Sequence, residues 1–114
     1  MHPDAAEEVT VTQAIELVAG EAILLDVREQ HEWDAGHAPQ AQHLAMSELS
    51  GRVDELPKDT QIVCVCHLGG RSAAVSAALN RAGWQALNLT GGMRAWAAEG
   101  QPVIDANGGP GLVD

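Results

Sequence analysis

Two continuously apolar segments dominate the hydrophobic pattern of this chain. Residues 22–27 read Ala-Ile-Leu-Leu-Asp-Val, and residues 61–66 read Gln-Ile-Val-Cys-Val-Cys. A short run of this kind is typical of a strand that is buried on both faces. Helical patterns separate and follow the two runs, and strands that alternate with helices belong to parallel sheets. The pattern therefore predicts an α/β domain whose parallel sheet is covered by helices on both faces.

Four segments carry apolar residues at helical spacing and are bounded by capping residues, glycine or proline. These helices are predicted at residues 12–19, 47–56, 72–82 and 93–99. Thr12 and Ser47 are the expected N-caps of the first two. The expected inner face of the third helix consists of Ala74, Val75, Ala78, Leu79 and Ala82. Weaker signals predict a helical turn at residues 29–35 and strands at residues 9–11, 43–45 and 84–89.

One compact domain is expected from a length of 114 residues, of which 46% are hydrophobic. It should comprise residues 1–104, followed by a glycine-rich and flexible tail at residues 105–114. Trp33, Trp84 and Trp96 are the only aromatic residues of the chain besides histidine, and we expect them in the core or packed against helices.

The charge balance is strongly acidic, with 16 acidic and 6 basic residues and a net charge of −10. Such a field repels nucleic acids and anionic lipids, so neither is an expected partner. Residues 1–8 carry acids and no long apolar stretch, which argues against a signal or transit peptide. No apolar run reaches membrane-spanning length. A reducing cytoplasm is the expected location, where thiols stay free.

Cys66 ends the second apolar run and opens the segment Cys-His-Leu-Gly-Gly-Arg-Ser at residues 66–72, directly before a predicted helix. Free backbone N–H groups and the positive end of the helix dipole gather at such a position. They lower the pKa of a thiol and favour the nucleophilic thiolate. The alternative is that Cys66 is a small buried hydrophobe, which is the interpretation we favour for Cys64. Adjacent positions on one strand do not favour a disulfide between the two.

A second polar cluster, Asp26 and Arg28, follows the first apolar run. Ligands of open parallel sheets bind beyond the carboxyl ends of the strands, so this cluster and Cys66 are expected to share a crevice. Asp26 could accept hydrogen bonds from the segment at residues 66–72, here called the Cys66 loop, and Arg28 could pair with Glu29, Glu32 or a substrate. The favoured alternative is an ion-pair network that holds neighbouring loops together. His37 and His43 lack the spacing of metal ligands and are expected to be structural.

Four stretches together resemble the rhodanese-like superfamily of sulfurtransferases. They read Leu-Leu-Asp-Val-Arg-Glu at residues 24–29, Glu-Trp-Asp-Ala-Gly-His-Ala at 32–38, the Cys66 segment at 66–72, and Leu-Thr-Gly-Gly-Met-Arg-Ala-Trp at 89–96. The resemblance spans residues 9–103 and implies a rhodanese-like domain at residues 1–104. It also implies a three-layer α/β/α fold with a five-stranded, mainly parallel sheet, and Cys66 as the sulfur carrier.

In that chemistry the Cys66 thiolate takes the outer sulfur of a donor such as thiosulfate and passes it from a persulfide to cyanide or a thiol. No metal or cofactor is expected. The substrate-binding positions implied by the resemblance are His67, Leu68, Gly69, Gly70, Arg71 and Ser72. Arg71 either binds the anionic end of the donor or braces the loop, and Ser72 is expected to cap the following helix.

Loop length distinguishes this chain from phosphatases and arsenate reductases, which on this fold use one more residue between cysteine and arginine. Four residues separate Cys66 from Arg71 here. His67 and Leu68 stand where thiosulfate-using relatives often carry cations, so a persulfide on a partner protein is an equal candidate donor. A non-catalytic binding module is the main alternative function, and a phosphatase is a weaker one. The sequence does not fix the oligomeric state, and a monomer is favoured.

Overall fold

The computed structural model describes residues 6–113 and contains one five-stranded sheet in the order β1-β5-β4-β2-β3. Every neighbouring pair of strands is parallel. The strands are β1 (Glu8–Val9), β2 (Ile23–Asp26), β3 (Gln42–His43), β4 (Gln61–Val65) and β5 (Gln85–Leu89). The predicted five-stranded parallel sheet is therefore confirmed. The first residues of the acidic N-terminal stretch, 1–5, lie outside the described part of the chain.

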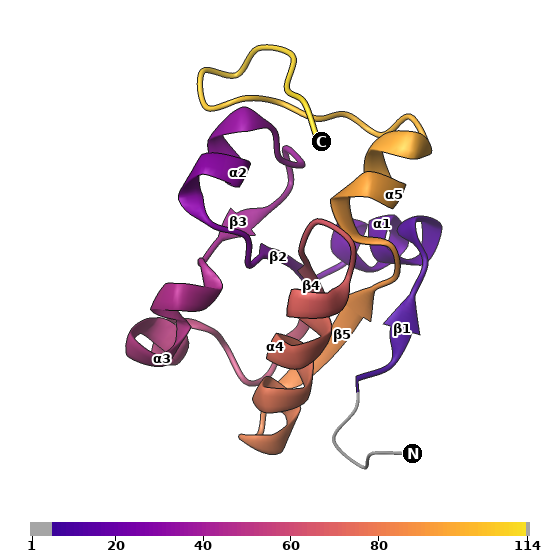
Figure 1. The fold of residues 1–114 in the computed structure, drawn as a ribbon. Coiled ribbons are helices and arrows are strands. Elements are labelled where there is room, and N and C mark those ends of the chain that lie inside the picture. The colour runs from indigo at the N-terminus through magenta and orange to yellow at the C-terminus, as the bar shows by residue number, and fades with distance from the viewer. Residues whose placement is uncertain (1–5, 114) are drawn as a thin grey trace.

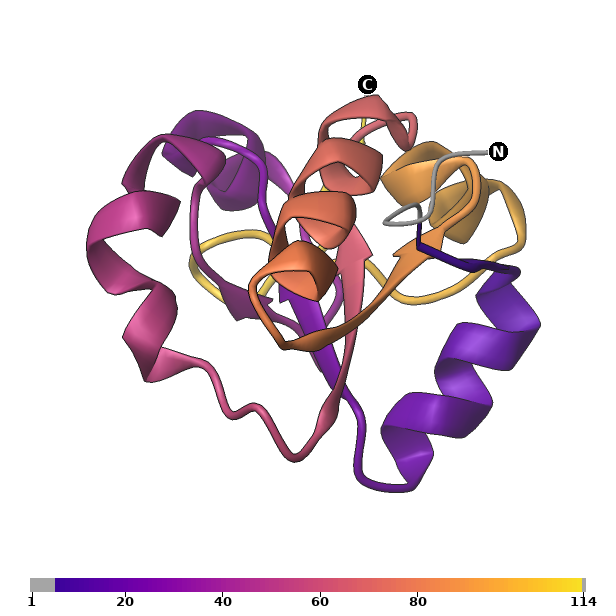
Figure 2. The ribbon, with the colours of Figure 1, turned by 90° about the horizontal axis from the view of Figure 1, so that it is seen from below.

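Helices cover both faces of the sheet (Figures 1 and 2). They are α1 (Val11–Ala19), α2 (Gln30–Ala35), α3 (Leu49–Arg52), α4 (Gly70–Arg81) and α5 (Gly92–Ala98). Short 3-10 turns at Met46–Glu48 and Val53–Glu55 extend α3 at both ends. Within residues 6–113, no helix combines the length and the apolar character that crossing a membrane requires.

The core consists of two apolar clusters, one on each face of the sheet. Successive residues from Ile62 to Cys66 contribute alternately to the two clusters. Ile62, Cys64 and Cys66 face α3 and α4, whereas Val63 and Val65 face α1 and α5. All five of these side chains are at most 1% exposed. A strand with both faces buried is what the continuous apolar run predicted.

Two of the three tryptophans complete these clusters, as expected. Trp84 packs with the α4 cluster and its indole N–H donates to the Leu56 carbonyl oxygen. Trp96 packs with the α5 cluster and donates to the Pro102 carbonyl oxygen. Trp33 is only partly buried, and its ring stacks with those of His37 and His43.

Two of the predicted helix caps, Thr12 and Ser47, are wrong. Thr10, not Thr12, caps α1, because its hydroxyl accepts from the Gln13 N–H and the Gln13 side chain completes a capping box. Ser47 is wrong as a cap: it lies within a 3-10 turn, and its hydroxyl donates to Glu29 instead. The predicted single helix at residues 47–56 is accordingly broken into three short turns.

The inner face predicted for α4 is partly wrong. Val75 and Leu79 are buried, but Ala74 and Ala82 are exposed. In place of these alanines the structure buries the hydroxyl residues Ser72 and Ser76. Both hydroxyls donate to acceptors within the protein, and these hydrogen bonds offset the cost of burying a polar group. The pattern of apolar residues could not predict the burial of these two serines.

The C-terminal segment returns across α2 (Figure 1). Ile104 forms antiparallel bridges with His37 and Pro110, and the Leu112 N–H donates to the Ala35 carbonyl oxygen at 2.9 Å. These contacts place the segment beside α2. The domain boundary at residue 104 and the flexibility of residues 105–114 remain predictions.

Candidate active site

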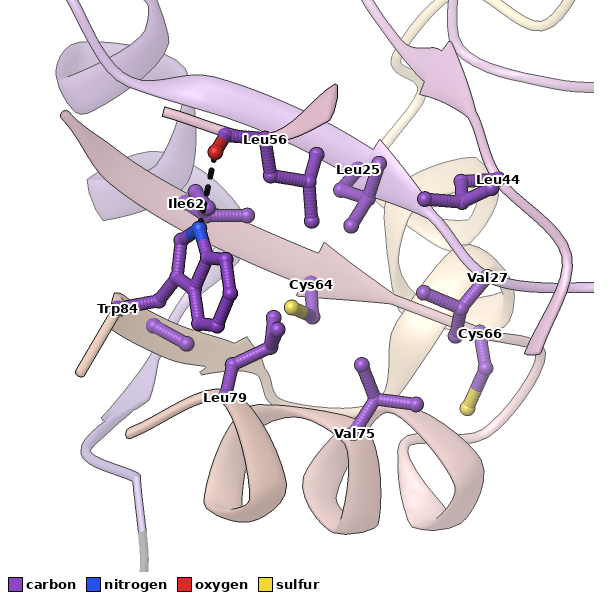
Figure 3. Close-up of a cluster of buried hydrophobic side chains, with 11 residues drawn as sticks. Leu25, Val27, Leu44, Leu56, Ile62, Cys64, Cys66, Val75, Leu79 and Trp84 are labelled. Atoms are coloured by element: carbon purple, nitrogen blue, oxygen red, sulfur yellow. Dashed lines mark hydrogen bonds between the residues drawn. The ribbon is translucent and has the colours of Figure 1, made fainter. Parts of the chain in front are cut away.

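Cys66 lies at the carboxyl end of β4, where the chain turns into α4. The turn is made possible by Gly69, whose φ of +113° lies in the left-handed region that other residues rarely adopt. Figure 3 shows the Cys64 sulfur inside the apolar cluster, whereas Cys66 lies at its rim, at the start of α4. The two thiols therefore lie on the same face of one strand but in different surroundings.

Hydrogen-bond donors surround the Cys66 sulfur. The Gly69 N–H lies 3.1 Å from Sγ and the Ser72 hydroxyl 3.3 Å from it. Burial raises the pKa of this thiol, whereas the Ser72 hydroxyl and three backbone amides lower it. Those amides belong to Ser72, Gly69 and Arg71. The hydrogen bonds outweigh burial, so the pKa of Cys66 lies below that of an ordinary thiol.

Cys64 shows the opposite balance. It is completely buried, and burial raises the pKa of its thiol to about 11 despite a hydrogen bond with Ser76. The sequence interpretation of Cys64 as a small hydrophobe is consistent with this environment. Of the two thiols, only Cys66 has a lowered pKa and therefore the greater tendency to ionise.

The first turn of α5 orients the Cys66 loop from the other side. The Met93 N–H donates to the Cys66 carbonyl oxygen at 2.8 Å, and the Arg94 N–H donates to the His67 carbonyl oxygen at 3.1 Å. Because these carbonyls turn toward α5, the amides that follow can turn toward the sulfur. Gly92 permits this approach, since a Cβ there would overlap the Cys66 carbonyl oxygen and lie 2.5 Å from that of His67.

The prediction that Ser72 caps α4 is wrong. Gly69 occupies the cap position, and Ser72 is the third residue of α4 with its side chain fully buried. Its hydroxyl lies 2.6 Å from the Asn88 Oδ1 atom as well as near the Cys66 sulfur. The Asn88 amide nitrogen in turn donates to Gly69 O and to the carboxylate of Glu8. This chain of contacts joins the loop to β5 and β1. Asn88 and Glu8 were not among the site residues predicted from the sequence.

Arg71 is paired with α2. Its Nη1 and Nη2 atoms lie 2.7 and 2.8 Å from the two carboxylate oxygens of Glu32. The hydrogen bond from Arg71 lowers the pKa of Glu32 to about 2, although partial burial opposes the shift. Of the two roles expected for Arg71, this geometry favours bracing of the loop.

Asp26 and Arg28 form a buried ion pair at the end of β2. The Arg28 guanidinium donates to both Asp26 oxygens, at distances from 2.7 to 3.1 Å, and also to the Gly36 carbonyl oxygen at 2.7 Å. These hydrogen bonds join β2 to the end of α2 rather than to the Cys66 loop or to Glu29 and Glu32. The structure therefore agrees with the favoured alternative of a bracing network.

The remaining predicted positions line the surface of the loop. His67 is partly buried, Gly70 is exposed, and Leu68 exposes 57% of its surface. A small cavity of about 40 Å³ lies beside His67, between Arg28, Glu32 and Leu112 of the C-terminal segment. Cys66 itself is 1% exposed, so its sulfur lies beneath the loop within a shell of polar donors. His37 donates from Nδ1 to the Trp33 carbonyl oxygen, and His43 donates from Nε2 to the Arg28 carbonyl oxygen. Both rings also stack on Trp33, as expected of structural residues.

Comparison with known proteins decides the family. The profile of the Rhodanese-like domain matches residues 10–99, which is most of the chain. The chain belongs to the rhodanese-like domain family. This agrees with the resemblance inferred from the four sequence stretches.

Relatives within the rhodanese-like family share both sequence and fold with this chain. The protein named "Putative sulfurtransferase YtwF" of Bacillus subtilis is 39% identical over 82 residues, covering 72% of this chain and 80% of that protein. A "Sulfurtransferase" of Allochromatium vinosum is 37% identical over 89 residues, covering 77% and 83%. The crystal structure of a rhodanese-related protein from Thermoplasma volcanium superposes with a TM-score of 0.80 at 28% identity, covering 86% of this chain and 97% of that one.

Proposed function

We propose that this protein is a sulfurtransferase in which Cys66 carries sulfane sulfur between a donor and an acceptor. The observation that carries the proposal is the environment of the Cys66 sulfur, which accepts hydrogen bonds from the Gly69 N–H and the Ser72 hydroxyl. These donors lower the pKa of the thiol and are already aimed at an anion. The names of the curated relatives support the same activity.

The first half-reaction loads the enzyme. The Cys66 thiolate attacks the outer sulfur of thiosulfate, forming a sulfur–sulfur bond while the bond to the sulfonate group breaks and sulfite leaves with that electron pair. With a persulfide donor, the thiolate attacks the terminal sulfur and the donor thiolate leaves. Cys66 then bears a persulfide, which is also anionic and stays within reach of the same amides.

The second half-reaction empties the enzyme. A thiolate or cyanide attacks the terminal sulfur of the persulfide, and the Cys66 thiolate is the leaving group. Stabilising the Cys66 anion therefore assists both steps, because it is the nucleophile of one and the leaving group of the other. The donors from Gly69 to Ser72 perform this role. His67 and Leu68 line the approach, and Asp26 and Arg28 hold the neighbouring loop. The proposed chemistry needs no metal or cofactor.

Sulfur loading is the first testable consequence. After incubation with thiosulfate or with cysteine persulfide, we expect the intact mass to increase by one sulfur atom. Cyanide or dithiothreitol will reverse the increase by accepting that sulfur. Failure to load with both donors would refute the proposed function. Partner binding without loading would instead favour a binding module, and faster hydrolysis of an aryl phosphate would favour a phosphatase.

A further inference from the structure

Two arginines beside the Cys66 loop, Arg71 and Arg28, are neutralised by carboxylates of the same molecule. Arg71 is the only arginine or lysine within residues 66–72, and Glu32 engages its guanidinium at two nitrogen atoms. Arg28 is likewise paired with Asp26 in a buried bridge of 2.7 Å. The charges of these two arginines and two carboxylates cancel. With the Cys66 thiolate included, the five side chains together carry one net negative charge.

We infer that Glu32 is a specificity-determining residue, which by occupying Arg71 directs the site away from small multiply charged anions and toward sulfur donors of low charge. An organic persulfide fits this class of donor, whereas thiosulfate is a dianion and does not. The inference rests on the proposed sulfurtransferase function and concerns only which donor that site prefers. Glu32 acts through Arg71 and does not itself contact the sulfur.

The geometry makes Glu32 a competitor of an anionic donor. Paired, fork-like hydrogen bonds between a guanidinium and a carboxylate are the arrangement that an oxyanion would also need. A thiosulfate that used Arg71 would first have to displace Glu32, which belongs to the first turn of α2 and also accepts the capping hydrogen bond from the Glu29 N–H. Glu32 stays ionised down to a pH of about 2, because the Arg71 hydrogen bond lowers its pKa. Mild acid therefore leaves Arg71 occupied.

The surroundings of the loop reinforce this preference. A net charge of −10 disfavours the approach of a dianion to an anionic sulfur. Leu68 exposes 57% of its surface on the loop and offers apolar contact instead of charge. Arg94, exposed in the first turn of α5 behind His67, is the other cation near the loop, so its contribution is tested separately.

The test is Glu32→Gln, which removes the charge and keeps the shape. The Glu29 N–H donates to Glu32 Oε1 at 3.1 Å, and a glutamine carbonyl oxygen can accept the same capping hydrogen bond. The donors are thiosulfate, methanethiosulfonate and cysteamine persulfide; the last pairs an anionic persulfide with an ammonium group, so the three carry two, one and no net negative charges. Removing one negative charge a few ångströms away should raise kcat/KM about tenfold for the dianion and about threefold for the monoanion. The persulfide should gain least, and the gains should appear mainly in KM.

Two control variants separate charge from structure. Glu32→Asp keeps the charge and should keep the wild-type ranking of donors. Glu55→Gln removes one charge from an exposed pair with Arg52 at the end of α3, and should also keep that ranking. If Glu32→Asp shifts the ranking as Glu32→Gln does, loosening of the loop is the cause and the inference is wrong.

The outcomes also separate the inference from the proposed function. A protein that accepts sulfur from none of the three donors contradicts the function itself. Loading from all three without a charge-dependent gain in Glu32→Gln contradicts only the role of Glu32. A wild-type preference for thiosulfate that disappears in Arg94→Ala would also overturn the inference, because Arg94 would then supply the anion site.

Discussion

Substitution of Cys66 by serine will abolish sulfur loading and lower sulfur transfer by at least about a thousandfold, as removal of a covalent nucleophile usually does. A serine oxygen cannot form a persulfide, and its hydroxyl does not ionise near neutral pH. The fold should survive, because serine has nearly the same shape and can accept the hydrogen bond from the Gly69 N–H. Intact mass after incubation with donor measures the loss, and the thermal unfolding temperature checks the fold.

Cys64→Ala is the matched control. Cys64 is fully buried, so the truncation should cost about 1–2 kcal/mol of stability through the cavity that it leaves. Loading at Cys66 should continue, because the raised pKa of Cys64 keeps that thiol protonated. A Cys64→Ala protein that is folded but cannot be loaded, beside a Cys66→Ser protein that can, would reverse the assignment of the sulfur carrier.

Gly92→Ala should be the most disruptive single-methyl change near the site. Gly92 has a φ of +60°, and a Cβ there would lie 2.5 Å from the His67 carbonyl oxygen. Left-handed strain and overpacking together should reduce the free energy of unfolding by about 3 kcal/mol. Because α5 holds the carbonyls that orient the Cys66 loop, sulfur loading should also slow by about a hundredfold. Chemical denaturation and the rate of loading measure the two effects.

Gly51→Ala provides the control for this change. Gly51 lies in α3 with no positive φ and no atom within 4 Å of an added Cβ. Alanine there should leave loading unchanged and stabilise the protein by about 0.4–1 kcal/mol. If Gly92→Ala and Gly51→Ala load sulfur at the same rate, α5 does not position the Cys66 loop.

The sequence predicted the parts of the site that are contiguous in the chain. An apolar strand, Cys66, two glycines and a helix follow one another within residues 61–81, so strand-end geometry and helix dipole could be reasoned from local order alone. The parallel sheet followed from alternating strands and helices, and the brief edge strands β1 and β3 carried only weak signals because each has two residues.

What could not be predicted depends on distant pairing. Glu32 and Arg71 are 39 positions apart, and Asn88 and Glu8 are 80 positions apart. Sequence reasoning therefore considered Glu32 as one of three alternative partners for Arg28 and not as a partner for Arg71, and it treated Ser72 as a cap. The hydroxyl of Ser72 points to Asn88 and the sulfur because tertiary contacts supply better partners than the helix end does.

The pH dependence of Cys66 alkylation tests the central claim most directly, that amides and a hydroxyl hold this sulfur as an anion. In the Cys64→Ala protein, iodoacetamide meets a single thiol, and mass spectrometry follows its modification. Because the pKa of Cys66 is lowered, the rate should reach half of its plateau value at a pH below the pKa of about 8.5 of a free thiol. A rate that rises only around or above that pH would contradict the account.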